Sequence, residues 1–363
     1  MPRLPDWNQL ADRSLNGAAL AREEARAVLT SPDEEMLPLL AATARVRRTY
    51  FGTRVKLNFL LNVKSGLCPE DCQYCSQSRG STAKIAKYPT LPAEKILAAA
   101  ERAQAVKAKR FCIVASGRGP TDGEVEELTE AVRAVRAARP EMEICCCLGL
   151  LRDSQAERLK ASGVFAYNHN LNTSERFYGE ICSTHTYGDR MATLERARRA
   201  GLSPCSGALF GMGESREDIL DLAYALRALR PDSIPINFLI PVEGTPLAGR
   251  TPLGPIICLK ILCLIRLLNP TAEVRIAGGR EVQLRWLQPF GLHVANSIFV
   301  GDYLTTRGQL PEADFALIRD LGFTIEGVGE VPDPALPSPW LPGGLGGGAG
   351  RLIEGADTPQ FFA

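Results

Sequence analysis

The feature of this sequence that most constrains its fold is a repeated alternation of short apolar runs with longer amphipathic segments. The alternation starts at Leu57 and continues to residue 321. The expected strands cover 57–63, 110–116, 143–149, 164–168, 203–210, 233–240, 273–277 and 294–299. The expected helices cover 92–108, 122–138, 153–162, 186–200, 215–229, 254–268, 281–288 and 311–321. Strand–helix units repeated in this way predict a parallel sheet with right-handed crossovers, and eight of them can close into a barrel. The sequence therefore predicts an α/β fold, a (β/α)8 TIM-type barrel over residues 51–325, with a doubly wound open sheet as the alternative.

The two ends of the chain differ from this pattern. In residues 1–50, apolar positions recur at helical spacing and Ser31-Pro32-Asp33-Glu34 is typical of a helix start, so we expect an N-terminal helical extension. Residues 326–363 become rich in proline and glycine after Val331. Such a segment cannot bury enough apolar surface to pack, which predicts a disordered tail.

The composition limits the classes of partner. Lys+Arg number 42 and Asp+Glu 41, so the net charge of +1 gives no electrostatic reason to expect nucleic acid or a membrane surface as a partner. The longest apolar stretch, 256–268, is interrupted by Lys260 and Arg266 and is not expected to span a membrane. The N-terminus has no apolar signal-peptide core. The 11 cysteines then indicate reduced thiols in metal or redox chemistry, in a cytoplasmic protein, rather than disulfides.

Three of these cysteines form the motif Cys68-Pro-Glu-Asp-Cys72-Gln-Tyr-Cys75, in a loop after the first expected strand. The spacing differs from the paired CxxC units of a zinc ribbon, and no nearby fourth Cys or His completes a tetrahedral site. Three thiolates can hold three irons of a [4Fe–4S] cluster and leave the fourth iron open to a ligand that is not protein. The alternatives are a three-cysteine zinc site with a remote fourth ligand, and thiols that are unrelated to one another.

Other cysteines lie within expected strands. Cys112 and Cys205 each lie inside one strand, and another strand contains Cys145, Cys146 and Cys147. Because side chains alternate along a strand, Cys145 and Cys147 share one face and Cys146 takes the other. A single buried cysteine is more often a small core residue than a ligand, but several together favour a metal site. We interpret the remaining cysteines as structural: Cys182, Cys258 and Cys263.

Arg275 is the least expected residue of the strands. In Glu273–Ala277 the alternation turns Val274 and Ile276 toward the helices, so Arg275 points into the barrel. A buried guanidinium needs a negative partner, and we find no acidic residue within the cores of the other strands. Thiolates around a [2Fe–2S] core carry negative charge that an arginine would offset. A carboxylate from a strand-end loop is the alternative partner.

Polar residues gather at the ends of several expected strands. Asn168, Asn170 and Asn172 repeat at period two, so their amides share a face and His169 takes the opposite one. Three amides suit a neutral ligand such as a ribose or a urea, although asparagine is also common in turns. His169 fits either a general base or a core histidine, and with 3 histidines in the chain, catalysis by histidine pairs is not expected.

Two further groups complete the candidate site. Gly211-Met-Gly213-Glu214 follows the fifth strand and would allow close approach of backbone to a ligand. Asn237, Thr305 and Thr306 add polar groups to two other strand ends.

The sequence resembles the biotin synthase family of radical S-adenosylmethionine (SAM) enzymes over about residues 35–325. The segments that carry the resemblance are SGLCPEDCQYCSQS, FCIVASGRGP, YNHNLNTS, CSGALFGMGES, PINFLIPVEGTPL, VRIAGGRE and ANSIFVGDYLTT. The resemblance implies a (β/α)8 barrel, usually in a homodimer, that inserts sulfur between two saturated carbons of dethiobiotin to form biotin. It also implies a [4Fe–4S] cluster that cleaves SAM, a [2Fe–2S] cluster that donates sulfur, and an electron donor such as flavodoxin or ferredoxin.

The resemblance also implies roles for individual residues. Cys68, Cys72 and Cys75 match the [4Fe–4S] ligands. The positions that match the [2Fe–2S] ligands are Cys112, Cys145, Cys205 and Arg275. The expected SAM contacts are Tyr74, Asn170, Asn172, Arg190, Gly211, Gly213 and Glu214. The expected dethiobiotin contacts are Asn168, Asn237, Thr305 and Thr306.

The sequence departs from the family pattern at two places. The family motif usually reads NHNLDT, and Asn172 replaces the aspartate that is expected to bind a SAM ribose hydroxyl. The run Cys145–Cys147 replaces a single cysteine, and we choose Cys145 because of its place before Leu-Gly, with Cys147 as the second choice. The alternative functions are another radical SAM barrel that uses only the first cluster, and a non-catalytic iron–sulfur scaffold or electron carrier.

Overall fold

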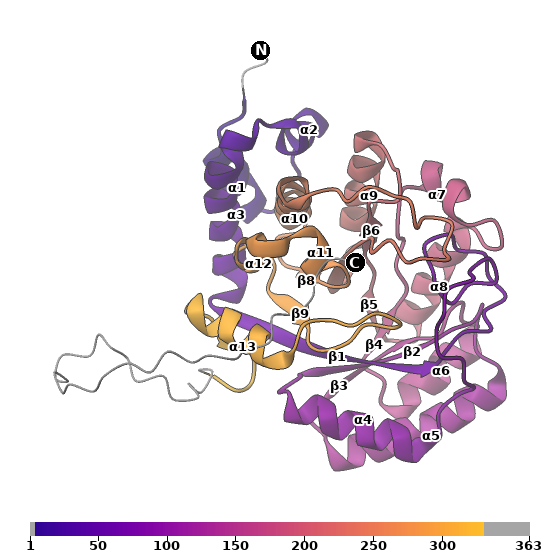
Figure 1. Ribbon diagram of the computed structural model, residues 1–363. Helices are drawn as coiled ribbons and strands as arrows, with labels where there is room; N and C mark the ends of the chain where they lie inside the picture. Colours follow the sequence, from indigo (N-terminus) through magenta and orange to yellow (C-terminus); the bar gives the residue numbers. More distant parts are fainter. Residues whose placement is uncertain (1–3, 330–363) are drawn as a thin grey trace, which may run out of the picture. The chain divides into compact units, whose positions relative to one another are not determined.

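The computed structural model describes residues 4–329, in which eight parallel strands close into a barrel (Figure 1). The strands follow the order β1-β2-β3-β4-β5-β7-β8-β9, and β9 pairs back with β1. Their bounds are β1 Arg54–Lys64, β2 Arg110–Ala115, β3 Glu143–Cys147, β4 Ala166–Asn168, β5 Ser203–Cys205, β7 Ser233–Phe238, β8 Glu273–Ile276 and β9 Ser297–Phe299. The ring is closed, so the predicted TIM-type barrel is confirmed and the open sheet is excluded.

Two details of the sheet differ from the prediction. The expected strand 203–210 is divided into β5 and β6 (Ala208–Phe210), and β6 pairs with β7. The break falls at Gly207, where a Cβ atom would lie 1.8 Å from the Pro235 carbonyl oxygen, so the two strands approach closely only because this residue is glycine. A short strand that we did not expect, β10 (Thr324–Ile325), pairs with the start of β1.

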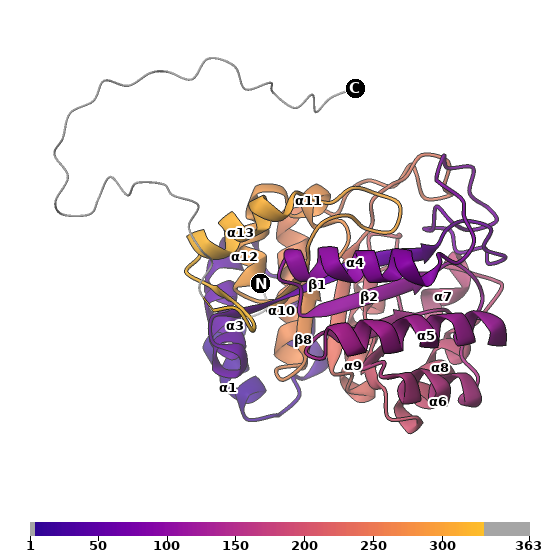
Figure 2. The same cartoon turned by 90° about the horizontal axis from the view of Figure 1, so that it is seen from below.

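Helices surround the barrel where they were expected. They are α4 Ala93–Ala105, α5 Asp122–Ala138, α6 Asp153–Ser162, α8 Tyr187–Arg199, α9 Arg216–Leu229, α10 Pro255–Leu268 and α13 Pro311–Asp320. Figure 2 shows α4 along the outer side of β1 and β2, with α5 and α6 following. Capping boxes fix the starts of α5, α8 and α9. In each helix the side chain of the N-cap residue accepts from the backbone of the third helical residue, whose side chain accepts from the N-cap backbone N–H. The N-cap residues are Thr121, Thr186 and Ser215.

The expected helix 281–288 is not continuous. The structure divides this region into α11 (Arg280–Gln283), the 3-10 turn η2 (Arg285–Leu287) and α12 (Gln288–Leu292). The chain leaves the α-helical conformation at Arg285, whose φ is 50°. Pro289 lies in the first turn of α12, where its missing N–H costs no helical hydrogen bond. The structure adds α7 (Glu175–Ile181), which the sequence prediction missed.

The N-terminal segment is helical, as predicted, with α1 Trp7–Leu15, α2 Arg22–Thr30, the 3-10 turn η1 Asp33–Glu35 and α3 Met36–Phe51. These helices pack on α10 (Figure 1), which is apolar almost all round and buried from Cys258 to Leu268. The two cations of α10 donate hydrogen bonds to backbone carbonyl groups of other segments. Lys260 donates to the Ser31 carbonyl at 2.6 Å, and Arg266 donates to the Val294 carbonyl at 2.9 Å.

Residues 4–329 belong to one compact unit. Within them, no helix has both the length and the apolar character needed to cross a membrane. The prediction of a disordered tail falls almost entirely on residues 330–363, which lie outside the described residues.

Candidate active site

A cavity of about 370 Å³ opens at the carboxyl ends of the barrel strands. In such barrels the loops after the strands form the site of chemistry. The cavity is lined by the loops after β1, β2, β3, β4, β7, β8 and β9. It brings together most of the residues that the sequence singled out: Cys68, Cys72, Tyr74, Cys75, Cys112, Cys145, Cys147, Asn168, Asn170, Asn172, Arg190, Asn237, Arg275, Thr305 and Thr306.

The loop of Cys68, Cys72 and Cys75 folds as a series of tight turns. The Cys75 N–H donates to the Cys72 carbonyl at 3.1 Å, and the Ser78 N–H donates to the Cys75 carbonyl at 3.1 Å. Burial raises the pKa of Cys75 to about 11 and also raises the pKa of Cys68. Such thiols ionise when they coordinate a metal. Three thiols on one short loop at a cavity wall therefore fit three corners of an iron–sulfur cluster.

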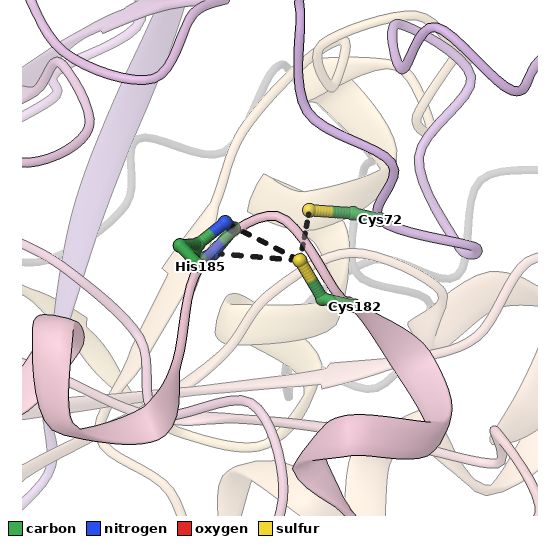
Figure 3. Close-up of side chains that lie close together, drawn as sticks. All are labelled: Cys72, Cys182 and His185. Atoms are coloured by element: carbon green, nitrogen blue, oxygen red, sulfur yellow. Dashed lines mark hydrogen bonds between the residues drawn. The ribbon is translucent and has the colours of Figure 1, made fainter.

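Two residues that the sequence prediction missed lie against this loop. Cys182 follows α7, and its Sγ lies 3.7 Å from the Sγ of Cys72 (Figure 3). The Nδ1 atom of His185 lies 3.3 Å from the Sγ of Cys182. The ligand atoms of Cys72, Cys182 and His185 all lie within 4.8 Å of one another, a spacing that a metal ion could bridge.

Cys182 is thus not merely a packing residue, as we had interpreted it. The Cys72 thiol bonds to Cys182, and together with His185 this lowers the pKa of Cys182 to about 4. The C-x2-H spacing of Cys182 and His185 was a visible signal, since it is common among metal ligands. The set includes only one of the three loop cysteines, so it differs from the three-cysteine zinc site considered as an alternative.

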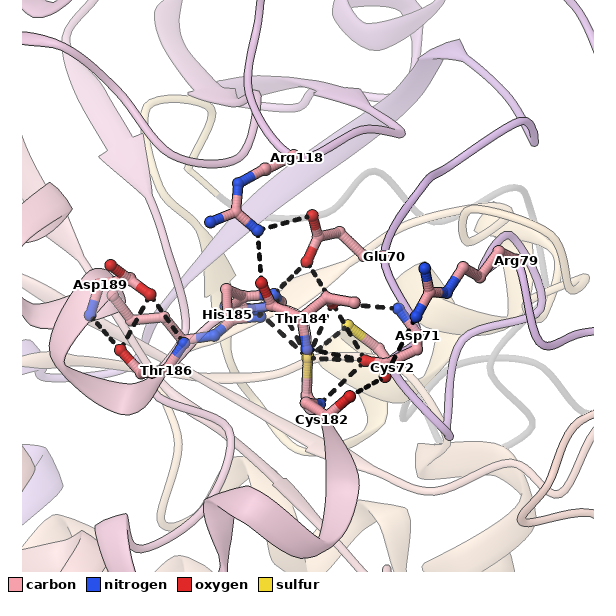
Figure 4. A network of polar contacts seen from close by, with 12 residues as sticks. Glu70, Asp71, Cys72, Arg79, Arg118, Cys182, Thr184, His185, Thr186 and Asp189 are labelled. Atoms are coloured by element: carbon pink, nitrogen blue, oxygen red, sulfur yellow. Dashed lines mark hydrogen bonds and ion pairs between the residues drawn. The ribbon is translucent and has the colours of Figure 1, made fainter.

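A polar network fastens the cysteine loop to the segment after α7 (Figure 4). Asp71 accepts hydrogen bonds from the backbone N–H groups of Ser183 at 2.9 Å and Thr184 at 3.2 Å. Glu70 accepts from the Thr184 hydroxyl at 2.5 Å, contacts His185 and pairs with Arg118 at 3.2 Å. Burial alone would raise the pKa of Asp71, but the hydrogen bonds that it accepts from Ser183 and Thr184 hold this pKa well below its usual range. The Pro-Glu-Asp part of the motif thereby positions Cys72.

The strand cysteines meet inside the barrel below this loop. Cys112 and Cys145 are register partners on β2 and β3, and Cys205 is the register partner of Asn168 on β4. The Cys145 thiol bonds to both Cys112 and Cys205. The hydrogen bond from Cys145 lowers the pKa of Cys205 to about 5, and nearby Arg275 and Arg110 act in the same direction.

Cys145 is the register partner of Cys112 and packs with it in one small buried cluster, which favours Cys145 over Cys147 as the ligand. Cys147 lies on the same face and also lines the cavity, whereas Cys146 packs into the core between sheet and helices. The parity prediction for the three cysteines is therefore confirmed.

Arg275 points into the barrel, as predicted, and is 1% exposed. We considered carboxylates in the other strands and in strand-end loops, but the partner in the structure comes from the same strand. Glu273, on the same strand, accepts from Arg275 Nη2 at 2.5 Å. Residues two apart on a strand share a face, so this partner was visible in the sequence and we overlooked it. Burial opposes the charge, but Glu273 and the neighbouring thiols raise the pKa of Arg275.

The asparagine series connects the strand thiols to the upper cavity. Asn168 Nδ2 lies 3.2 Å from Cys205 Sγ and donates to Asn170 Oδ1 at 3.0 Å. Asn170 Oδ1 also accepts from the Gly207 N–H at 3.0 Å. Asn172 Nδ2 donates to the Tyr74 hydroxyl at 2.6 Å, which joins the series to the cysteine loop.

His169 does not face away from these amides, as the alternation implied, but also lines the cavity. The strand ends at Asn168, so period two does not continue beyond it. Burial, together with Arg190 and His185, holds the pKa of His169 well below its usual range, so the ring is neutral. Its Nε2 has no hydrogen-bond partner within residues 4–329, which leaves a polar atom available to a ligand.

The other residues predicted to contact SAM or dethiobiotin form hydrogen bonds to different parts of the site. Arg190 donates to the Asn170 carbonyl at 2.8 Å and lies 2.9 Å from His185 Nε2. Thr305 bonds to the hydroxyl of Ser76, beside Cys75, at 2.7 Å. Asn237 donates to the Ala208 carbonyl at 3.1 Å and accepts from the Gly278 N–H at 3.0 Å.

The Gly211–Glu214 turn does not reach the cavity lining. Glu214 accepts from the N–H groups of Gly211 at 2.6 Å and Met212 at 2.8 Å, so its carboxylate closes its own turn. A Cβ on Gly213 would lie 2.7 Å from the Arg250 guanidinium. The role predicted for these three residues in SAM binding stays a prediction.

Two family models match parts of this chain. Residues 62–225 match the family described as the Radical SAM superfamily, and residues 235–324 match the Biotin and Thiamin Synthesis associated domain. Among solved structures, methylornithine synthase is similar with a TM-score of 0.76 at 20% identity, covering 86% of this chain and 96% of that one. The [FeFe]-hydrogenase maturase HydG from Carboxydothermus hydrogenoformans has a TM-score of 0.74 at 20% identity, covering 88% of this chain and 79% of that one. At this identity both show the fold alone.

Curated relatives are much more similar in sequence. A biotin synthase from Streptomyces coelicolor is 55% identical over 93% of this chain and 83% of its own length. A biotin synthase from Geobacillus thermodenitrificans is 53% identical over 89% of this chain and 97% of its own length. With this identity over nearly the whole length, and with a barrel whose cavity is lined by the three loop thiols and by Cys112 and Cys145, the chain belongs to the biotin synthase family of radical SAM enzymes.

Proposed function

We propose that this cavity inserts a sulfur atom between two saturated carbons of dethiobiotin to form biotin, with the residues assigned below. The observation that carries the proposal is that three loop thiols and a group of strand thiols beside Arg275 line one cavity. Saturated carbons carry no acidic proton at neutral pH, so their activation requires radical chemistry, which a cofactor must supply. When bound, the two clusters would supply the electron that cleaves SAM to a carbon radical and the sulfur that is inserted.

The chain would hold the two clusters on separate parts of the barrel. Cys68, Cys72 and Cys75 would hold the [4Fe–4S] cluster on the loop after β1. The [2Fe–2S] cluster would be held lower in the barrel by Cys112, Cys145, Cys205 and Arg275. The second set suits an anionic cluster, because Arg275 and Arg110 already act on the pKa of Cys112 and Cys205 there.

The substrates would bind between these two sets. Tyr74, Asn170, Asn172 and Arg190 would contact SAM beside the cysteine loop. The Gly211–Glu214 turn lies outside the cavity lining and would support the residues that contact SAM rather than contact it directly. Asn168, Asn237, Thr305 and Thr306 would contact dethiobiotin. Asn168 contacts Cys205 Sγ, which supports a substrate position directly above the sulfur donor. The closed barrel walls would keep water away from the radical.

Anaerobic reconstitution with iron and sulfide tests the proposal. We expect the protein, SAM, dethiobiotin and a reductant to give both 5′-deoxyadenosine and biotin. Cys72→Ala should abolish both products, whereas Cys205→Ala should abolish biotin and retain SAM cleavage, and Cys258→Ala on buried α10 should retain both. Retention of [2Fe–2S] absorption in a Cys112→Ala/Cys205→Ala variant would favour a radical SAM enzyme with one cluster. Absence of 5′-deoxyadenosine from the unmodified protein would favour a scaffold.

Three further assignments belong to the same proposal. The electron donor is a flavodoxin or ferredoxin, and the half-exposed Arg79 and Arg118 beside the cysteine loop suit an acidic carrier. Each carrier is tested by replacing the chemical reductant and measuring 5′-deoxyadenosine at low and high salt.

The active form is a homodimer, which light scattering of the reconstituted protein tests. The compartment is the cytoplasm, because all 11 cysteines are unpaired and a reducing environment keeps thiols available to iron.

A further inference from the structure

Three of the four candidate [2Fe–2S] ligands follow a charged residue placed two positions earlier on the same strand. The pairs are Arg110 and Cys112, Glu143 and Cys145, and Glu273 and Arg275. Side chains two apart on a strand point to the same side. The three charged residues therefore form a layer inside the barrel, one step below the ligands.

The charges of this layer are paired with one another. Arg110 Nη2 lies 2.8 Å from Glu143 and 3.2 Å from Glu273. Lys56, from β1, reaches Glu143 at 2.7 Å and Glu273 at 3.5 Å. Lys56 also lies 3.8 Å from Glu326. Arg275, one step above, pairs with Glu273, so the group holds three cations and three anions and is formally neutral.

Glu273 has a second set of contacts, which fixes the Arg275 guanidinium. It accepts from Arg275 Nη2 at 2.5 Å and from the Ser297 hydroxyl at 2.9 Å, and the same hydroxyl lies 3.3 Å from Arg275 Nε. Two of the three guanidinium nitrogens are therefore held on the side away from the cavity. Nη1 makes no hydrogen bond within residues 4–329, and Arg275 lines the cavity together with Cys112 and Cys145.

We propose that Glu273 is the positioning residue that presents Nη1 of Arg275 to the three strand thiols, and so to the [2Fe–2S] cluster that they hold. This inference rests on the proposed function, since it assigns a role toward the cluster of that same site. Glu143 has the same charge and lies in the same layer, but it contacts Arg110 and Lys56 rather than Arg275. Replacing each glutamate in turn therefore separates the effect of losing a negative charge from the effect of releasing the Arg275 guanidinium.

The test compares Glu273→Gln with Glu143→Gln in the full-length, anaerobically reconstituted protein. Each variant removes one negative charge from the layer and keeps the side-chain shape. The readouts are iron and sulfide per chain, the visible absorption and Mössbauer signals of the [2Fe–2S] cluster, and SAM cleavage without dethiobiotin as a measure of the other cluster. We expect Glu273→Gln to lower [2Fe–2S] affinity roughly tenfold, as for other residues that orient a metal ligand. Glu143→Gln should keep the [2Fe–2S] signals, and both variants should keep SAM cleavage.

The outcomes separate the possible explanations. Equal losses in both variants would show that the layer acts through its total charge, and a normal [2Fe–2S] signal in Glu273→Gln would show that it has no role; either result overturns the inference. If Glu273→Gln does not fold, Lys56→Met/Glu273→Gln restores neutrality to the layer: continued loss of the cluster supports positioning, and its recovery contradicts it. An unmodified protein that binds no [2Fe–2S] cluster would instead refute the proposed function.

Discussion

At the scale of single residues, Asn172 is a cavity-lining position at which this chain departs from its family pattern. Asn172 adopts a left-handed φ of 69°, which asparagine tolerates better than most residues, and donates to the Tyr74 hydroxyl. The family expectation at this position is an aspartate that binds a ribose hydroxyl. A carboxylate accepts a hydrogen bond from a hydroxyl more strongly than an amide does.

We therefore predict that Asn172→Asp tightens SAM binding. The Tyr74 hydroxyl would donate to one carboxylate oxygen and leave the other for the ligand. One strengthened hydrogen bond corresponds to a KM for SAM about three- to tenfold lower, measured from 5′-deoxyadenosine formation. Asn237→Asp is the matched control, because Asn237 lines the same cavity, is assigned to dethiobiotin, and its Oδ1 already accepts from the Gly278 N–H. An equal fall in KM for both variants would indicate a general effect of negative charge.

A second prediction at this scale concerns the thiols of Cys72 and Cys182. With Sγ atoms 3.7 Å apart and a lowered pKa at Cys182, the Cys182 thiolate can attack a disulfide and then be attacked in turn by Cys72. We expect cluster-free protein treated with oxidised glutathione to form a Cys72–Cys182 disulfide and release reduced glutathione. Peptide mapping by mass spectrometry checks this. Cys258 and Cys263, buried in α10, should stay reduced, and a mixture of random pairings would contradict the prediction.

At the scale of elements, α10 joins the N-terminal helices to the barrel. Its side chains from Cys258 to Leu268 are buried, so both of its faces contribute to one core. We predict that Leu262→Ala, at 0% exposure, lowers the free energy of unfolding by about 2–5 kcal/mol. Leu37→Ala on α3, at 62% exposure, should change it by less than about 0.5 kcal/mol. Urea denaturation of the two variants provides the measurement, and similar losses would argue against this packing.

The junction of α12 with α3 should make stability depend on pH. His293 follows α12, packs edge-on against Phe323, and lies near Arg47 and Arg48 of α3. Burial and the two arginines lower the pKa of His293 below its usual value. As the pH falls below about 6.5, the unfolded chain therefore binds a proton before the folded protein does, and stability decreases.

His293→Gln tests this pH dependence. The fall in Tm between pH 8 and pH 5.5 should be smaller in the variant than in the unmodified protein, because glutamine does not titrate. An identical pH dependence of Tm in His293→Gln and the unmodified protein would contradict the assignment.

At the scale of the whole molecule, the fold and the metal chemistry depend on different residues. The two large core clusters are apolar side chains between sheet and helices, whereas the candidate ligands lie in the cavity or just beneath it. We predict that removing iron with a chelator and reductant abolishes SAM cleavage and the visible absorption but leaves the far-UV circular dichroism nearly unchanged. Adding iron and sulfide anaerobically should restore both signals. Loss of helical signal with the iron would show instead that the clusters support the barrel.

Much of this architecture could be predicted from the sequence, because local periodicity determines strands and helices before any contact is known. The ends of α5 and α6 were predicted to the residue, since a capping box starts α5 at Asp122 and Gly163 ends α6 in a left-handed conformation. The break between β5 and β6 could not be found in this way. It depends on how closely β7 passes Gly207, which is a contact between distant segments.

For the site, the sequence by itself determined the cysteine loop and the inward direction of Arg275. The first depends on spacing within eight residues and the second on strand alternation, and both are local properties. Only the tertiary structure decided that Cys182 and His185 lie against Cys72, because more than a hundred residues separate them and barrel closure brings them together. It also decided that Glu273 accepts a hydrogen bond from Arg275, whereas Glu143 pairs with Arg110 and Lys56. Both are glutamates two positions before a candidate ligand, and which cations surround each one depends on the neighbouring strands in the closed ring.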